Sequence, residues 1–128
     1  MNVLFPESIP EACRLLARHP EAVPLAGGTD LLVHWPQQVK EPERPFLDLS
    51  GIQALRSHHW TDDELLLGAL TTYWDIIQDP TAQAEAPLLV EAAKQVGAVQ
   101  IQTRGTWGGN IVNASPAADG VAVLMAYD

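Results

Sequence analysis

The chain has 128 residues, of which 47% are hydrophobic and 18% charged, a composition that is typical of folded globular proteins and excludes intrinsic disorder. We expect one compact domain of this length, with no room for two independent cores. The 7 basic and 16 acidic residues give a formal net charge of -9, so nucleic acid and anionic membranes are unfavourable partners.

A helix, a buried strand and a second helix are predicted at the start of the chain. Ser8, with Glu11 following in the first turn, is a capping box, and the helix that it opens ends before Pro20. The apolar residues 23–26 predict a short buried strand, which stops at a pair of glycines. The next apolar stretch begins a helix at Thr29.

The middle of the chain predicts short strands separated by turns. Pro36 is expected to stop or kink the second helix, and the polar residues 37–45 are expected to form a surface loop. A strand over residues 46–49 leads into a turn and a short helical piece. Residues 56–60 and 65–69 flank an acidic turn and predict a hairpin.

The second half of the chain is predicted to be mainly helical. Thr72 and Asp75 form another capping box, which opens a short helix. Residues 87–96 have the spacing of an amphipathic helix, with Gly97 as its C-cap. The small and apolar residues 120–127 predict a last helix. Mixed short strands and helices favour the α+β fold class.

The first candidate binding segment covers residues 25–31, where Gly27 and Gly28 join the strand to the helix. Glycine reaches positive φ, so successive backbone N–H groups can point into one concavity and bind a phosphate without lysine or arginine. Thr29 adds a hydroxyl donor. The alternative is a plain left-handed turn with Thr29 or Asp30 as the helix cap. The residues that define a P-loop or a dinucleotide fingerprint are missing here.

The second candidate segment covers residues 103–119 and holds three glycines within five residues. Ordering so many glycines is entropically unfavourable, which indicates a role beyond filling space. Gly108 and Gly109 would let a ligand approach the backbone closely. Thr106 and Asn110 can donate hydrogen bonds to phosphate or hydroxyl oxygens.

The end of this segment predicts a helix start at Ser115 and Pro116, with Asp119 in its first turns. Asp119 is either a carboxylate that the helix dipole favours or an acceptor for sugar or ribityl hydroxyls of a ligand. Because a carboxylate repels a pyrophosphate, we expect Asp119 and the glycine segments to serve different parts of one ligand. Trp107 is expected in the core or at its rim, and its place inside the segment makes it the tryptophan most suited to touch a ligand.

Together these segments resemble the FAD-binding (medium) subunit of the xanthine dehydrogenase and carbon monoxide dehydrogenase family, the molybdenum hydroxylases. The resemblance rests on Leu-Ala-Gly-Gly-Thr-Asp-Leu at residues 25–31 and on Gly-Gly-Asn-Ile-x-x-Ala-Ser-Pro-x-x-Asp at residues 108–119. Residues 46–52 and 67–72 are similar to the connecting segments of that family, in the same order. Each motif is short, but the ordered set covers nearly the whole chain.

The resemblance implies a truncated form of the vanillyl-alcohol-oxidase-like (PCMH-type) FAD-binding domain, an α+β fold, because members of the family are considerably longer. Residues 1–55 would form a first α+β subdomain, and residues 56–128 the beginning of an incomplete second one, with unfinished strands near residues 108–113. FAD is the implied cofactor, and no catalytic residue is expected. The implied cofactor-binding residues are Leu25, Ala26, Gly27, Gly28, Thr29, Asp30, Leu31, Thr106, Gly109, Asn110 and Asp119.

The implied function is electron transfer in a multi-component oxidoreductase, from iron–sulfur clusters through the flavin to NAD or another acceptor. Molybdopterin and 2Fe-2S clusters are expected on partner chains, a large molybdopterin-binding subunit and a small iron–sulfur subunit. The 128-residue chain is expected to be inactive alone. The alternative is a truncated, non-catalytic fragment that associates with partner subunits without holding FAD.

Other features predict neither a metal site nor export. Cys13 is the single cysteine, cannot ligate a cluster alone, and is expected to pack as a small hydrophobic side chain. His58 and His59 would leave opposite faces of a strand, so they cannot bind one ion together. No signal peptide or membrane span is visible in the sequence, and a cytoplasmic location is expected.

Overall fold

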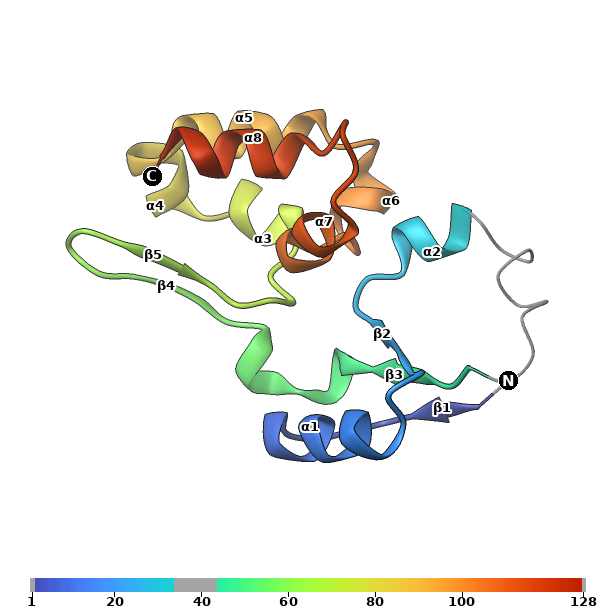
Figure 1. Ribbon diagram of the computed structural model, residues 1–128. Coiled ribbons are helices and arrows are strands. Elements are labelled where there is room, and N and C mark those ends of the chain that lie inside the picture. The colour runs from blue at the N-terminus through green and yellow to red at the C-terminus, as the bar shows by residue number, and fades with distance from the viewer. Residues whose placement is uncertain (1, 34–43, 128) are drawn as a thin grey trace.

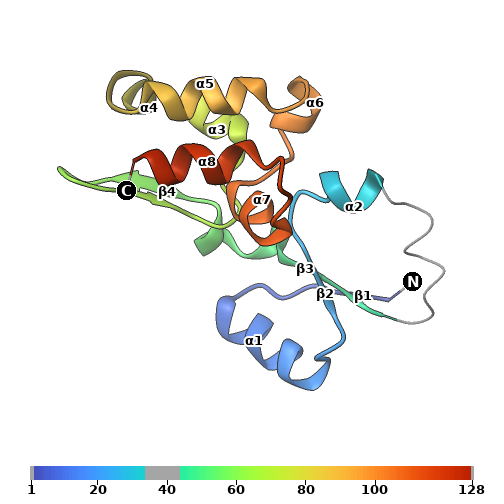
Figure 2. The ribbon, with the colours of Figure 1, turned by 45° about the horizontal axis from the view of Figure 1, so that its top comes forward.

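Figure 1 shows the computed structural model of the protein, which describes residues 2–33 and 44–127. A small sheet and the first helix lie at one end of the molecule, and the later helices gather at the other end in both views (Figures 1 and 2). Within the described ranges, no helix has the length and apolar character needed to cross a membrane. The predicted helix end at Pro36 and most of the predicted loop over residues 37–45 lie outside the described residues.

Three short parallel strands form the sheet at the N-terminal end. In spatial order they are β1 (Val3–Leu4), β3 (Phe46–Asp48) and β2 (Val23–Leu25). Phe46 pairs with both Val3 and Val23, so β3 is the central strand. The helix α1 (Ile9–Arg18) connects β1 to β2, and Ala12 from this helix and Leu47 from β3 belong to the same buried cluster.

The start of α1 differs from the predicted capping box by one residue. Ser8 Oγ accepts from Glu11 N at 3.3 Å, as predicted, but the Glu11 carboxylate accepts from Glu7 N at 2.9 Å and not from the backbone of Ser8. Two donors at the helix start are still satisfied. Cys13 is exposed, so its predicted packing in the core is wrong.

The glycine turn leads into α2 (Thr29–Val33), which lies beside α7 (Trp107–Asn113) in Figure 1. After β3 the chain makes the two short 3₁₀ turns η2 (Leu49–Gly51) and η3 (Gln53–Leu55). The predicted hairpin is confirmed: β4 (His58–Trp60) pairs antiparallel with β5 (Leu65–Leu67).

The second half of the chain is a group of short helices around the larger buried cluster. The helices are α3 (Tyr73–Ile77), α4 (Pro80–Glu85), α5 (Pro87–Gln95), α6 (Val99–Gln102), α7 (Trp107–Asn113) and α8 (Asp119–Ala126). The capping box of Thr72 and Asp75 is present at the start of α3, as predicted. Figures 1 and 2 show α5 and α8 side by side, and these two helices are in contact. The helix α4 had no counterpart in the sequence prediction.

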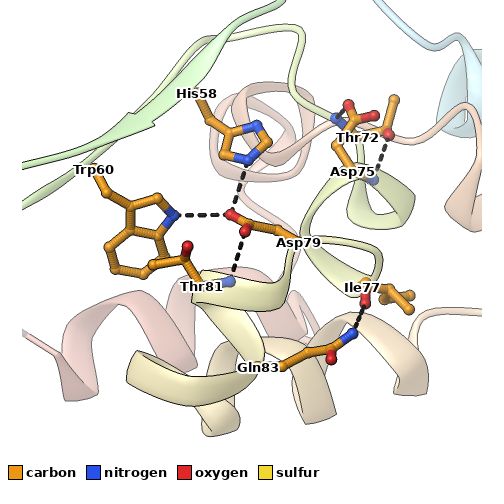
Figure 3. A network of polar contacts seen from close by, with 8 residues as sticks. All are labelled: His58, Trp60, Thr72, Asp75, Ile77, Asp79, Thr81 and Gln83. Carbon is orange, nitrogen blue, oxygen red and sulfur yellow. Dashed lines mark hydrogen bonds and ion pairs between the residues drawn. The ribbon is translucent and has the colours of Figure 1, made fainter.

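One carboxylate ties the hairpin to these helices (Figure 3). Asp79 Oδ2 accepts from Trp60 Nε1 at 2.8 Å and lies 3.0 Å from His58 Nε2, so both hairpin side chains converge on it. Its other oxygen accepts from Thr81 N at 2.8 Å and caps α4. The Asp79 side chain is only 12% exposed, so the three contacts are made largely away from water.

The expectation of a single core is wrong, because the buried hydrophobic side chains form two clusters. The smaller one holds residues of the parallel sheet and α1, such as Leu47 and Ile52. The larger one holds residues of α3, α4, α5 and α7, such as Ile76, Leu89 and Trp107. The elements before the η3 turn and the elements after it therefore bury separate sets of apolar side chains.

Residues 108–113 are helical, so the expectation of unfinished strands there is wrong. Thr106 caps α7, because its Oγ1 accepts from Gly109 N at 3.0 Å. The predicted helix start at Ser115 is also wrong. Ser115 Oγ accepts from Ala117 N at 3.3 Å in a local turn, and α8 begins at Asp119.

Candidate functional site

A pocket of about 550 Å³ opens between the glycine turn that precedes α2 and one face of α7. This volume lies within the usual range for a small-molecule site. Most of the cofactor-binding residues implied by the sequence line it, namely Ala26, Gly27, Gly28, Thr29, Asp30, Leu31, Thr106, Gly109 and Asn110. Leu25 and Asp119 do not. The two segments, distant in sequence, therefore face one common hollow.

The backbone of the first segment turns at Gly28, which has a φ of 74° in the left-handed region that favours glycine. Leu32 N donates to Gly28 O at 2.9 Å in the first helical bond of α2. The amides of Thr29, Asp30 and Leu31 precede that bond and have no acceptor within the helix. These three N–H groups lie on residues that line the pocket.

Gly27 is required for a different reason from the one expected. It does not have a positive φ, but its Cα lies against another part of the backbone. A Cβ added at Gly27 would lie 1.9 Å from the carbonyl oxygen of Arg104. Arg104 Nε also donates to Gly27 O at 3.3 Å. Gly27 thus permits the close contact that brings the two segments together.

The second segment presents one face of a helix to the pocket. Thr106, Gly109, Asn110 and Asn113 line it, at the spacing of residues that share a helix face. Because Thr106 Oγ1 already accepts from Gly109 N, the hydroxyl hydrogen of Thr106 remains available to donate into the pocket.

Asn110 adds a second donor. Its Oδ1 is sealed from solvent and has no hydrogen-bond partner among the described residues. This oxygen packs against Gly120, where an added Cβ would lie only 2.5 Å from it. The amide nitrogen Nδ2 is therefore the polar atom of Asn110 that is left to face the pocket.

Gly108 and Trp107 belong to the other side of α7. A Cβ at Gly108 would lie 2.6 Å from Ala69 O, so this glycine permits close packing within the protein and not the ligand contact expected for it. Trp107 is 1% exposed and does not line the pocket. Its ring meets that of Tyr73 edge-on, with centroids 4.9 Å apart. Trp107 is a core residue.

Several lining residues carry no signal in the sequence. Tyr73, Val96 and Ile101 line the pocket but have the spacing of ordinary core positions of helices. Burial, followed by the negative charge of Asp119, raises the pKa of Tyr73 to about 12. Asp119 itself is exposed at the start of α8.

Charged side chains contribute little to this pocket. Among the described residues, no lysine, arginine or histidine lines it, and the one carboxylate, Asp30, is exposed. The other polar groups of the pocket include the free amides of α2, the Thr106 hydroxyl and Asn110 Nδ2, which can all donate hydrogen bonds. A set of donors without a cation suits an anionic group such as a diphosphate.

Comparison with known proteins agrees with this chemistry. The whole chain, residues 1–128, matches the sequence profile of a family described as the FAD binding domain in molybdopterin dehydrogenase. The chain belongs to this family. The family that the sequence resembled is thereby confirmed, and FAD is the cofactor of such domains.

Two relatives are similar in sequence, and one solved structure shares the fold. The carbon monoxide dehydrogenase medium chain of Hydrogenophaga pseudoflava is 36% identical over 124 residues, which cover 96% of this chain and 43% of that protein. The caffeine dehydrogenase subunit beta of Pseudomonas sp. (strain CBB1) is 36% identical, over 98% of this chain and 42% of the relative. A solved carbon monoxide dehydrogenase from Hydrogenophaga pseudoflava superposes with a TM-score of 0.88 at 35% identity, over 96% of this chain and 43% of that one. The chain spans less than half the length of these relatives, and the predicted fold class is confirmed.

Proposed function

We propose that this chain holds FAD in the pocket between α2 and α7, with the diphosphate against the backbone of residues 27–31. The observation that carries the proposal is the convergence of unused donors on one hollow: the three free amides of α2, the Thr106 hydroxyl and Asn110 Nδ2. In a protein with a formal net charge of -9, fixed dipoles of this kind replace the basic side chains that often bind phosphates.

The residues of this chain would bind and orient the cofactor and exclude water from its phosphates. The isoalloxazine of bound FAD supplies the redox chemistry, since it takes up and releases electrons. We propose that the full protein transfers electrons from iron–sulfur clusters to NAD or another acceptor within a molybdenum-containing dehydrogenase. Large and small partner subunits would carry the molybdopterin and the clusters. The names of the relatives, a medium chain and a subunit beta, support a complex of several chains.

We also propose that residues 1–55 are the first subdomain and residues 56–128 the beginning of the second. The two separate buried clusters support this division, because one is built from residues up to 55 and the other from residue 60 onwards. The pocket lies where residues from both parts meet.

A titration with FAD tests the proposed site through the glycine turn. Flavin fluorescence should be quenched in a saturable manner by the wild-type chain. In Gly28→Ala the left-handed conformation is unfavourable by roughly 1–2 kcal/mol, so the turn will shift and the three amides will lose their common direction. We expect FAD affinity to fall about tenfold or more.

Gly97→Ala is the matched control. Gly97 also has a positive φ, 49°, and does not line the pocket itself; a Cβ there would meet the side chain of Ile101 first, and Ile101 belongs to neither glycine segment's set of donors. The two variants should lose similar stability, while Gly97→Ala keeps FAD affinity within about twofold of wild type. Equal FAD affinity for Gly28→Ala and Gly97→Ala would contradict the assignment of the diphosphate to this turn.

A second candidate function is association with partner subunits without FAD. Exposed apolar side chains on the last two helices favour it, since Ile111 is 48% and Met125 74% exposed. A wild-type chain that keeps its helical circular dichroism but does not quench flavin fluorescence would support this candidate over FAD binding.

A further inference from the structure

Tyr73 stands in the pocket wall next to the second glycine segment. Its N–H donates to Gly105 O at 3.2 Å, and the neighbouring Thr72 forms a bridge with Thr106. The ring lies against the Gly105 backbone, where an added Cβ would come within 2.9 Å of the ring carbon Cε2. With the Trp107 ring edge-on to it at 64°, the phenol is held from two sides.

The hydroxyl of Tyr73 is an unused polar group at this site. The residue is only 3% exposed, yet no hydrogen bond joins its hydroxyl to any described residue. The Tyr73 oxygen is not fully sealed from solvent, whereas Trp107 Nε1 and Asn110 Oδ1, which also lack a partner, are sealed. Tyr73 lines the pocket, so the pocket is the surface at which this hydroxyl can meet a ligand.

This hydroxyl keeps its proton under ordinary conditions and can donate it to a ligand. Burial and the nearby charge of Asp119 raise the pKa of Tyr73 to about 12, so the proton stays on the oxygen at neutral pH. Asp119 does not line the pocket. Acceptors such as the Asp30 carboxylate and the Asn113 amide also line the pocket, but no hydrogen bond joins them to the Tyr73 hydroxyl, which therefore stays free for an acceptor on a ligand.

We propose that Tyr73 is a further ligand-binding residue of this site, whose hydroxyl donates a hydrogen bond to a phosphate oxygen of the bound dinucleotide. The inference rests on the proposed FAD function and adds a residue from α3, outside both glycine segments. A phosphate oxygen is the fitting acceptor because Gly105, whose carbonyl oxygen accepts from Tyr73 N, lines the same pocket as the proposed diphosphate cradle.

The chain offers a matched pair of variants, because it contains two tyrosines. Tyr73→Phe removes the hydroxyl and keeps the ring that packs on Gly105 and Trp107. Tyr127→Phe is the control, since the Tyr127 oxygen accepts from Leu88 N at 3.0 Å and does not line the pocket. Dissociation constants are measured for FAD, ADP and riboflavin with wild type and both variants.

Tyr73→Phe should weaken FAD and ADP by roughly tenfold, as expected for a lost hydrogen bond to a charged acceptor, and leave riboflavin within about twofold. Tyr127→Phe should leave all three within about twofold. Unchanged FAD affinity in Tyr73→Phe, or an equal loss for riboflavin, would overturn the assignment of the hydroxyl to a phosphate.

A second measurement separates this inference from the proposed function. In protein labelled with [13Cζ]tyrosine, ADP should shift the resonance that is missing in Tyr73→Phe and leave the Tyr127 resonance in place. Absence of FAD quenching together with this shift would count against FAD binding and for the role of Tyr73. A Tyr73 resonance that does not respond to ADP at the highest soluble concentration would overturn the role of Tyr73.

Discussion

Replacement of Asp79 by asparagine tests whether one carboxylate holds the hairpin against the helices. The asparagine side chain would keep an oxygen for Thr81 N, and asparagine caps a helix as well as aspartate does. Its amide group, however, would face the indole N–H of Trp60, which now donates to Asp79 Oδ2 at 2.8 Å. A donor facing a donor in a site that is 12% exposed leaves a largely buried polar group unsatisfied. That loss is unfavourable by about 2 kcal/mol.

The assay is urea unfolding followed by tryptophan fluorescence, with Asp48→Asn as the control. Asp48 also caps a short helix, through a single bond from Ser50 N at 2.9 Å, but it has no indole partner. We expect Asp48→Asn to stay within about 0.5 kcal/mol of wild type. For Asp79→Asn, a loss of about 2 kcal/mol corresponds to a melting temperature lower by roughly 8 °C for a chain of this size. Equal unfolding free energies for the two variants would refute the reasoning.

The same variant should change the response of the fold to acid. Partial burial raises the pKa of Asp79, but the hydrogen bonds from Trp60, Thr81, His58 and Ala82 outweigh it, and the net pKa lies below the ordinary value of 3.8. A lowered folded-state pKa means that this stabilisation is present above pH 3.8 and is lost as pH falls through the folded-state pKa. Asp79→Asn should lose this part of the acid dependence. An unchanged slope of unfolding free energy between neutral and acidic pH would contradict the role of the carboxylate.

Two further outcomes are expected. Gly27→Ala would place a Cβ 1.9 Å from Arg104 O, so the glycine turn must move away from the second segment, and FAD affinity should fall by about tenfold or more. Gly51→Ala is the control, because its Cβ would lie 3.1 Å from Pro6 O, and it should bind FAD like wild type. Normal FAD affinity in Gly27→Ala would contradict this role of Gly27. Because burial raises the pKa of Tyr73 from 10.0 to about 12, the folded state holds this proton more tightly than the unfolded state, and stability should fall as pH rises from 10 towards 12. Thermal melts should show a shallower fall in Tyr73→Phe, and parallel curves would contradict the burial of the phenol.

Local signals accounted for much of the fold. Ser8 and Thr72 cap helices as their sequences predict, and the acidic turn between residues 60 and 65 joins a hairpin. These features depend on residues that are neighbours along the chain, so the sequence contains the whole interaction. The glycine turn before α2 is of the same kind, because Gly28 adopts the positive φ that its type permits.

The parts that sequence reasoning missed depend on contacts between distant segments. Gly108, Gly109 and Asn110 are poor helix formers, yet they lie in α7, because Thr106 caps that helix and Gly108 packs against the backbone of Ala69. Packing against a distant segment outweighs the low helix propensity of these residues, and no local sequence pattern predicts that packing.

The roles of individual pocket residues were hidden for the same reason. Gly27 appeared to be a second source of free amides, but the backbone of Arg104 is what requires glycine there. Tyr73 has the spacing of a core residue on α3, and its bond to Gly105 O and the pairing of Thr72 with Thr106 bring it to the pocket. Neither contact can be deduced without knowing how residues far apart in the sequence meet.

A crystal structure of this chain with FAD is the most direct test of the account. We predict density for the diphosphate within hydrogen-bond distance of the amides of Thr29, Asp30 and Leu31 on one side and of Thr106 and Asn110 on the other. Ordered FAD bound at a different surface, or an empty pocket in crystals grown with saturating cofactor, would contradict it.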